Sequence, residues 1–268
     1  MQVIVITGAS DGIGAEVARQ LARREGGKLA LVLAARSRDK LEQVAIDCRR
    51  HGAHVLSQPT DVGVQAQCQA LVEAAVSTYG RIDILINNAG MSAHALFADV
   101  KDLGWYEDLM RINHWGAVWC THAALPHLRH ARGHIVAVSS QLGFVGLPGR
   151  SAYCATKGAM NMFFEALRLE LAPHGVGVTL SYPGVVATAI RERGFDAGGK
   201  AAGRSSLDES GAMSVETCAR LLIEGMDRRD RDTIMTAKGK LARWLRLLAP
   251  GLLDRIALKA VKQDARPH

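Results

Sequence analysis

The chain has 268 residues, 48% of them hydrophobic and 22% charged, as is ordinary for a soluble globular protein that buries a large core. It lacks both the run of about 18 apolar residues that spans a membrane and a C-x-x-C pair that would suggest zinc or a disulfide frame, which favours a reduced, cytoplasmic protein. Residues 238–268 hold most of the net charge of +7, and no basic stripe elsewhere indicates nucleic-acid binding.

A strand-like segment at residues 3–6 leads into a glycine-rich turn, and it begins so close to the first methionine that we expect no signal peptide. The turn, residues 7–14 (TGASDGIG), precedes a helix predicted from Ala15 to about Arg24. Glycines at such a turn let the backbone approach a pyrophosphate, and the helix N-terminus offers it free N–H groups. The spacing alone is a weak signal, because any tight strand–helix turn has a similar composition.

The second apolar strand, residues 29–33, leads to Arg36, Ser37 and Arg38. In NAD-binding sheets of this type an acidic residue usually stands near this strand end and holds the ribose 2′-hydroxyl. Arg36 stands there instead, and a guanidinium suits the 2′-phosphate of NADP. We therefore predict NADP(H) as the preferred cofactor and NAD(H) as the alternative. An arginine that simply begins the next helix in solvent would give the same pattern.

Strand-like and helical segments continue to alternate, with further strands predicted at 53–57 and 82–86. A βαβα series of this kind predicts a doubly wound parallel sheet, the Rossmann fold, with about seven strands and helices on both faces. Ligands bind such sheets at the carboxyl ends of the strands, where Asp61 and residues 87–90 (NNAG) fall. Asp61 by itself would also suit a helix N-cap.

The most informative stretch is residues 139–157, which follows a buried strand at 135–138 and contains Ser140, Tyr153 and Lys157. Tyr153 and Lys157 are four residues apart and so share one helix face. A lysine ammonium in that place favours the phenolate and is expected to lower the tyrosine pKa from about 10 toward neutrality. Tyr153 could then exchange a proton with a carbonyl or alcohol oxygen, to which Ser140 could donate a hydrogen bond.

In this order the motifs resemble those of the short-chain dehydrogenase/reductase family, in its compact single-domain form. The resemblance extends from Val3 to about Thr236 and rests on five ordered motifs: residues 7–14, Asp61, residues 87–90, the Ser140/Tyr153/Lys157 set and Pro183-Gly184. The basic tail, Arg36-Ser37 and residues 123–126 (AALP) resemble the hydroxysteroid-dehydrogenase-like branch, whose members often take lipophilic ketones.

The resemblance implies a catalytic set of four residues. Tyr153 would be the general acid/base, and Ser140, thirteen residues before it, would hold the substrate oxygen. Lys157 would bind the nicotinamide ribose and lower the pKa of Tyr153. Asn113 would kink a long helix and anchor a water that relays protons to the lysine.

The resemblance also implies how the cofactor is held, and it requires no metal. Asp61 and the backbone of Val62 would meet the adenine, while the backbone of Val186 and the hydroxyl of Thr188 would meet the nicotinamide carboxamide. The full set of predicted cofactor-binding residues is Gly8, Ser10, Asp11, Gly12, Ile13, Gly14, Arg36, Ser37, Asp61, Val62, Asn88, Ala89, Gly90, Tyr153, Lys157, Pro183, Gly184, Val186 and Thr188.

These observations predict a nucleotide-binding oxidoreductase, an NADP(H)-dependent carbonyl reductase or alcohol dehydrogenase that interconverts a ketone or aldehyde and an alcohol. The alternative is an NADP(H)-binding sensor, or a membrane- or partner-associated protein, with little turnover. By resemblance, a lid at about 190–213 closes over the substrate, and helices near 102–128 and 151–173 form a homodimer or homotetramer. The sequence does not decide between small polar and lipophilic substrates.

We divide the chain into a Rossmann-fold domain, residues 1–237, and a basic amphipathic extension, residues 238–268. One helical face of the extension carries Leu241, Trp244, Leu245 and Leu248, and a second apolar stripe begins at Leu252 after a Pro-Gly break. Two short helices of this kind predict either peripheral contact with an anionic membrane through 240–263, or a cover for the substrate pocket or a neighbouring subunit. Both alternatives stay open.

Overall fold

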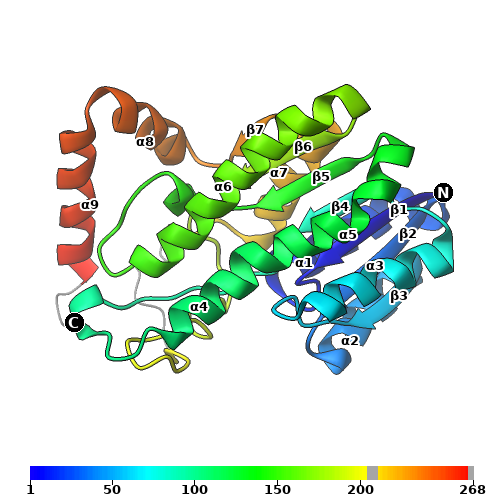
Figure 1. Cartoon of the computed structure of the whole chain (residues 1–268), viewed down its shortest axis with the longest axis horizontal. Coiled ribbons are helices and arrows are strands. Elements are labelled where there is room, and N and C mark those ends of the chain that lie inside the picture. The colour runs from blue at the N-terminus through cyan, green and yellow to red at the C-terminus, as the bar shows by residue number, and fades with distance from the viewer. Residues whose placement is uncertain (204–210, 265–268) are drawn as a thin grey trace.

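The computed structural model describes residues 1–203 and 211–264, which form a seven-stranded parallel sheet between two helical layers (Figure 1). The strands are β1 (Gln2–Thr7), β2 (Leu29–Ala35), β3 (His54–Pro59), β4 (Ile84–Asn87), β5 (His134–Val138), β6 (Gly177–Tyr182) and β7 (Asp232–Ile234). The helices are α1 (Gly12–Glu25), α2 (Arg38–Arg50), α3 (Gln65–Tyr79), α4 (Gly104–Met110), α5 (Gly116–Ala131), α6 (Ser151–Leu171), α7 (Val215–Asp227), α8 (Ala237–Leu248) and α9 (Pro250–Asp264). The predicted doubly wound Rossmann fold is confirmed.

The strand order β3-β2-β1-β4-β5-β6-β7 means that the chain winds outward from β1 in both directions. Side chains of β1 alternate between the faces: Ile4 and Ile6 pack toward α1, α2 and α7, and Val3 and Val5 pack toward α3, α5 and α6. Burial of both faces explains why residues 3–6 of β1 and the whole of β2 are continuous apolar runs. All carboxyl ends share one edge, and the winding reverses between β1 and β4, where such folds bind ligands.

Helices α8 and α9 pack against each other at one end of the molecule, beyond β7 (Figure 1). The two short helices predicted for the C-terminal extension are therefore present. No helix in the described ranges is both long and apolar enough to cross a bilayer.

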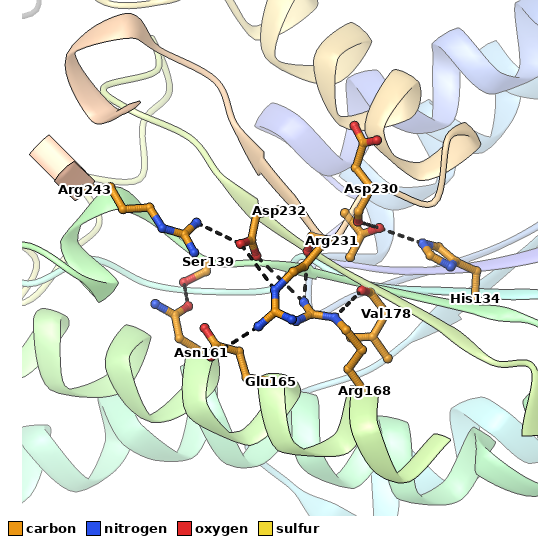
Figure 2. Close-up of polar contacts among 11 residues, drawn as sticks. His134, Ser139, Asn161, Glu165, Arg168, Val178, Asp230, Arg231, Asp232 and Arg243 are labelled. Atoms are coloured by element: carbon orange, nitrogen blue, oxygen red, sulfur yellow. Dashed lines mark hydrogen bonds and ion pairs between the residues drawn. The ribbon is translucent and has the colours of Figure 1, made fainter. Parts of the chain in front are cut away.

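A buried histidine begins β5. His134 Nε2 lies 2.9 Å from Thr179 Oγ1, whose hydroxyl donates to the Asp230 carbonyl at 2.5 Å (Figure 2). Thr179 Oγ1 must then accept a hydrogen bond from His134 Nε2–H. In the neutral ring this leaves Nδ1 without a proton. Nδ1 has no hydrogen-bond partner among the described residues, and it faces Gly177, where a Cβ would lie only 2.3 Å away. A second proton on this ring would therefore have no acceptor.

We expect His134 to make the fold acid-sensitive. Burial, with repulsion from Arg229, lowers the pKa of His134 to about 4, against 6.5 normally. Between these two pKa values the unfolded chain binds a proton that the folded chain does not. The free energy of unfolding therefore falls as the pH falls, by up to about 1.4 kcal/mol per pH unit. Urea unfolding at about pH 7 and about pH 5 gives the loss of unfolding free energy per pH unit. This loss should be smaller in His134→Gln than in the wild type. Equal slopes in both proteins would mean that another group is responsible.

Candidate active site

The predicted motifs gather at the carboxyl edge of the sheet, because each one directly follows a strand. Tyr153 and Lys157, on the first turns of α6, lie next to this edge. The turn at 8–14 follows β1, Arg36 follows β2 and Asp61 follows β3. Asn88 follows β4, Ser139 and Ser140 follow β5, and Pro183 follows β6.

The turn after β1 is pressed against the segment after β4. Gly8 has a left-handed backbone, with φ of 66°, and a Cβ on it would lie 2.8 Å from the Ala89 Cα. A Cβ on Gly14 would lie 2.4 Å from Asn88 Nδ2. The Asn88 amide donates to the carbonyls of Thr7 at 2.9 Å and Gly8 at 3.1 Å. Only glycine fits at positions 8 and 14, and the resulting cradle at the N-terminus of α1 suits a pyrophosphate.

The rest of this turn meets the segment that follows β6. A Cβ on Gly12 would lie 3.3 Å from Thr188 Cγ2, so the two predicted cofactor segments touch. Asp11 caps α1, since its Oδ1 accepts from Gly12 N at 2.7 Å, and its Oδ2 pairs with Arg193 at 3.0 Å. Its carboxylate is thus occupied within the protein. The remaining predicted residues of the turn, Ser10 and Ile13, are half-buried.

Val186 is buried at the centre of the segment after β6. Its carbonyl accepts from Thr188 N at 2.9 Å and from the Arg191 guanidinium at 2.7 Å. Gly184 lies against the start of α8, where a Cβ would meet Thr236 Cγ2 at 3.0 Å. This segment, which begins at Pro183, therefore runs from β6 to the glycine cradle along the carboxyl edge.

Arg36 and Ser37 lie in the loop between β2 and α2, and both side chains are exposed. Arg36 forms no ion pair or hydrogen bond through its side chain with any residue in the described ranges. Its guanidinium is therefore available to a ligand at this end of the sheet.

Asp61 closes a turn after β3 rather than capping a helix. Its Oδ1 accepts from Gly63 N at 2.9 Å, and α3 begins only at Gln65. The alternative reading of Asp61 as a helix N-cap is therefore wrong. Val62 is buried beside it, so close to α5 that a Cβ on Gly116 would lie 2.8 Å from the Val62 side chain.

Tyr153, Ser140 and Lys157 converge beside the end of β5. The Ser140 side chain lies close enough to the Tyr153 hydroxyl to lower the pKa of that phenol. Lys157 Nζ lies 5.9 Å from the centre of the Tyr153 ring and donates to the Val138 carbonyl at 2.9 Å. The sheet thus fixes the ammonium close to the phenol.

The two serines after β5 have different partners. Ser139 is buried and donates to Asn161 Oδ1 at 2.5 Å (Figure 2). The Ser140 Oγ accepts from Leu142 N at 3.2 Å, and its side chain lies close enough to the Tyr153 hydroxyl to lower the pKa of that phenol. Ser140, rather than Ser139, is therefore the serine that lies beside Tyr153, the predicted acid/base.

Asn113 is fully buried in a π-turn, Arg111–Trp115, that joins α4 to α5. Its Oδ1 accepts from Met91 N at 2.7 Å, and its Nδ2 donates to Met91 O at 2.9 Å and Thr156 Oγ1 at 3.0 Å. A Cβ on Gly90 would lie 3.2 Å from Asn113 Oδ1 and 3.7 Å from Lys157 Nζ. The Asn113 amide thus holds the loop after β4 beside the lysine.

A family model described as short chain dehydrogenase matches residues 2–197. The chain belongs to the short-chain dehydrogenase family. It is 37% identical over 256 residues to the 11-beta-hydroxysteroid dehydrogenase-like 4A of Arabidopsis thaliana, covering 94% of this chain and 82% of that protein. It is 34% identical over 259 residues to the 11-beta-hydroxysteroid dehydrogenase A of Sesamum indicum, covering 94% and 73%.

Among solved structures, the chain is similar to a short-chain dehydrogenase from Sphingobium yanoikuyae in complex with NADPH. The TM-score is 0.77 at 32% identity, covering 95% of this chain and 96% of that one. Together these relatives confirm the predicted family and its hydroxysteroid-dehydrogenase-like branch.

Burial dominates the electrostatics of this short-chain dehydrogenase. It raises the pKa of Tyr153, an effect that the Ser140 hydrogen bond and the Arg150 guanidinium only partly offset. It also lowers the pKa of Lys157 to about 8. The prediction that Lys157 brings the tyrosine pKa toward neutrality is therefore wrong for this structure, because both groups lose solvation in the same pocket. At neutral pH Tyr153 is a protonated phenol, suited to donating a proton.

Two polar bridges beside the site were missed from the sequence. The buried Arg150 donates to Ser92 Oγ at 3.0 Å and to the Ala93 carbonyl at 2.8 Å, tying the loop after β4 to the start of α6. Gln141 Nε2 donates to Thr236 Oγ1 at 2.7 Å and joins the loop after β5 to α8. An arginine or glutamine in a polar loop gives no periodic signal, so only the tertiary contacts reveal these roles.

The described part of the predicted lid, residues 190–203, folds back on the loop after β4. Phe195 N donates to the Ser92 carbonyl at 3.0 Å, and the Phe195 ring centre lies 5.7 Å from that of Trp105. Both rings belong to an apolar cluster against which Tyr153 packs. Residues 204–210 of the predicted lid lie outside the described residues.

Proposed function

We propose that this short-chain dehydrogenase is an NADP(H)-dependent oxidoreductase that interconverts a ketone or aldehyde and an alcohol. The observation that carries the proposal is the convergence of Tyr153, Ser140 and Lys157 beside the glycine cradle. A half-buried phenol, beside a serine hydroxyl and close to an ammonium, can give a proton to a substrate oxygen or take one from it. An NADP(H) sensor with little turnover would not need this set.

Each residue has one task in the proposed mechanism. When bound, the nicotinamide supplies or accepts the hydride. Ser140 holds the substrate oxygen beside Tyr153, which gives that oxygen its proton during reduction and takes it back during oxidation. Lys157 holds the nicotinamide ribose. The cradle formed by Gly8 and Gly14 binds the pyrophosphate at the N-terminus of α1.

We favour NADP(H) over NAD(H) because Arg36, at the end of β2, is exposed and has no side-chain partner among the residues that the structure describes. The Sphingobium enzyme, similar over nearly its whole length, is described in complex with NADPH. A guanidinium at this place pairs with the 2′-phosphate, whereas an acidic residue would hold the 2′-hydroxyl of NAD.

Arg36→Asp should weaken NADPH binding about 10- to 100-fold, the worth of one or two charge-assisted hydrogen bonds, and leave NADH binding unchanged or stronger. The dissociation constants of both cofactors can be measured by titrating each into the protein and following the quenching of protein fluorescence. Arg38→Asp, an identical change of charge two residues away, is the matched control and should have little effect. Equal weakening of NADPH and NADH by Arg36→Asp would remove the phosphate assignment.

For the substrate we propose a lipophilic ketone. The relatives are named as an 11-beta-hydroxysteroid dehydrogenase and an 11-beta-hydroxysteroid dehydrogenase-like protein, and the surroundings of Tyr153 include the apolar cluster with Trp105 and Phe195. NADPH consumption with small diketones, long-chain ketones and steroid ketones tests this substrate class. Turnover of the last two supports it, and turnover confined to small diketones contradicts the class but not the reaction.

We further propose that the chain forms a homodimer or homotetramer through α4, α5 and α6. A groove of about 640 Å³ between these helices is lined in part by Met110, Trp115 and Trp119. Trp115 is 46% exposed, and its ring stacks on that of Trp119. Light scattering that gives the mass of a single chain at micromolar concentration would contradict this assembly.

A further inference from the structure

Helix α8 carries its apolar side chains on the outer surface of the molecule. Leu248 is 78% exposed, Leu247 70%, Trp244 64% and Leu241 59%. At about 100° per residue, these four side chains and Lys240 fall within an arc of roughly 120°. A run of large apolar side chains in one exposed arc marks an interaction surface rather than ordinary surface composition.

The opposite side of α8 is fastened to the protein by polar groups. Arg243 donates to Asp232 Oδ2 at 2.8 Å (Figure 2), and Arg246 donates to the Phe144 carbonyl. Gly239 is buried, and a Cβ on it would lie 2.4 Å from Gln141 Nε2. Both guanidinium groups thus bind the protein on the side of α8 away from the apolar arc, which leaves that arc facing outward. The alternative in which this stripe covers the substrate pocket of its own chain does not fit.

Helix α9 extends this surface. Leu252 and Ile256 are each 49% exposed and lie one turn apart, whereas Leu253 is buried and packs the helix onto the protein. Arg255 and Lys259 are exposed on the same side of α9 as Leu252 and Ile256. The two helices stand together at the end of the molecule that holds the loop after β5 (Figure 1).

Cations accompany the apolar side chains on both helices. Lys238, Lys240, Arg255 and Lys259 are exposed, and none forms an ion pair or a side-chain hydrogen bond with a residue in the described ranges. Asp254 is the one acidic residue between positions 237 and 259. This charge favours an anionic surface and opposes a second copy of the chain, which would bring the same cations face to face.

We propose that α8 and the first turns of α9 lie in the interface of a bilayer that contains anionic phospholipids. Trp244 and the leucines of α8 enter the boundary between headgroups and acyl chains, and Lys240 extends to the phosphates. Lys238, Arg255 and Lys259 add attraction to anionic headgroups. The contact does not depend on the proposed reaction, because none of these residues belongs to the candidate active site.

Co-flotation of the full chain with phospholipid vesicles tests the contact. Vesicles of phosphatidylcholine with phosphatidylglycerol are compared with vesicles of phosphatidylcholine alone, at low and high salt. Trp244→Gln/Leu248→Gln should weaken partitioning about tenfold or more, the worth of two lost apolar insertions. Ile46→Gln/Val64→Gln is the matched control: it also changes two exposed apolar residues, outside the C-terminal helices, and should float like the wild type.

The wild type should float with the anionic vesicles, lose part of its binding at high salt, and show a blue shift of tryptophan fluorescence on binding. Absence of flotation with anionic vesicles, or equal flotation of the two double variants, would overturn the proposal. Light scattering tests the other possible partner of this apolar face, a second copy of the chain. If Trp244→Gln/Leu248→Gln lowers the mass of the assembly and leaves vesicle binding unchanged, the face is a self-association surface and the proposal is wrong.

Discussion

Replacing Tyr153 with phenylalanine is expected to slow carbonyl reduction roughly 10²- to 10⁴-fold, the usual contribution of a positioned general acid. The change removes one oxygen atom from a half-buried ring, so packing against the apolar cluster remains. NADPH affinity should stay nearly the same, because the cradle and Lys157 are untouched. Steady-state rates and NADPH titrations on the same preparation separate the two effects.

Tyr106→Phe is the matched control for this change. Tyr106 packs in the same apolar cluster, and its hydroxyl lies 3.1 Å from Ser151 Oγ rather than beside Ser140. It should keep most of the activity. Reduction at a wild-type rate by Tyr153→Phe would show that another group supplies the proton.

Asn113→Leu is expected to lower the free energy of unfolding by about 3 kcal/mol and the rate by roughly 10²-fold. The substitution leaves the backbone N–H and carbonyl of Met91 and the hydroxyl of Thr156 without the partner they have now. Each unsatisfied group costs about 1–3 kcal/mol. Release of the loop at Gly90 then shifts the surroundings of Lys157, and displacements near 1 Å cost about two orders of magnitude in rate.

Urea unfolding and turnover at saturating NADPH measure both losses. Asn87→Leu is the comparison, because its buried amide donates only to Thr121 Oγ1, at 2.9 Å, and its Oδ1 has no partner among the described residues. Its loss of stability should be the smaller. If Asn113→Leu unfolds and turns over like the wild type, the bridge from the π-turn to Met91 does not position the site.

The fold and the place of the site were predictable from local patterns. The apolar runs at 3–6 and 29–33 are strands buried on both faces, and a polar or glycine-rich segment follows each one. Because parallel strands share a carboxyl edge, such segments must meet there. The four-residue spacing of Tyr153 and Lys157 likewise determined that they share a helix face.

Features that depend on tertiary surroundings were not predictable in this way. The spacing of Tyr153 and Lys157 suggested a lowered tyrosine pKa, but burial raises the pKa of Tyr153 and lowers that of Lys157. The amphipathic pattern of α8 identified its apolar face but not its direction. That direction depends on the contacts of Arg243 and Arg246 with distant parts of the chain.

The most direct test of the proposed reaction is deuterium transfer from NADPH labelled at C4 of the nicotinamide. The purified protein is incubated with a lipophilic ketone in ordinary water, and the alcohol product is examined by mass spectrometry. We predict deuterium on the carbinol carbon, from the label on one face of the nicotinamide only. Saturable NADPH binding with no labelled alcohol from any ketone of the panel would contradict the oxidoreductase assignment and favour a cofactor-binding sensor.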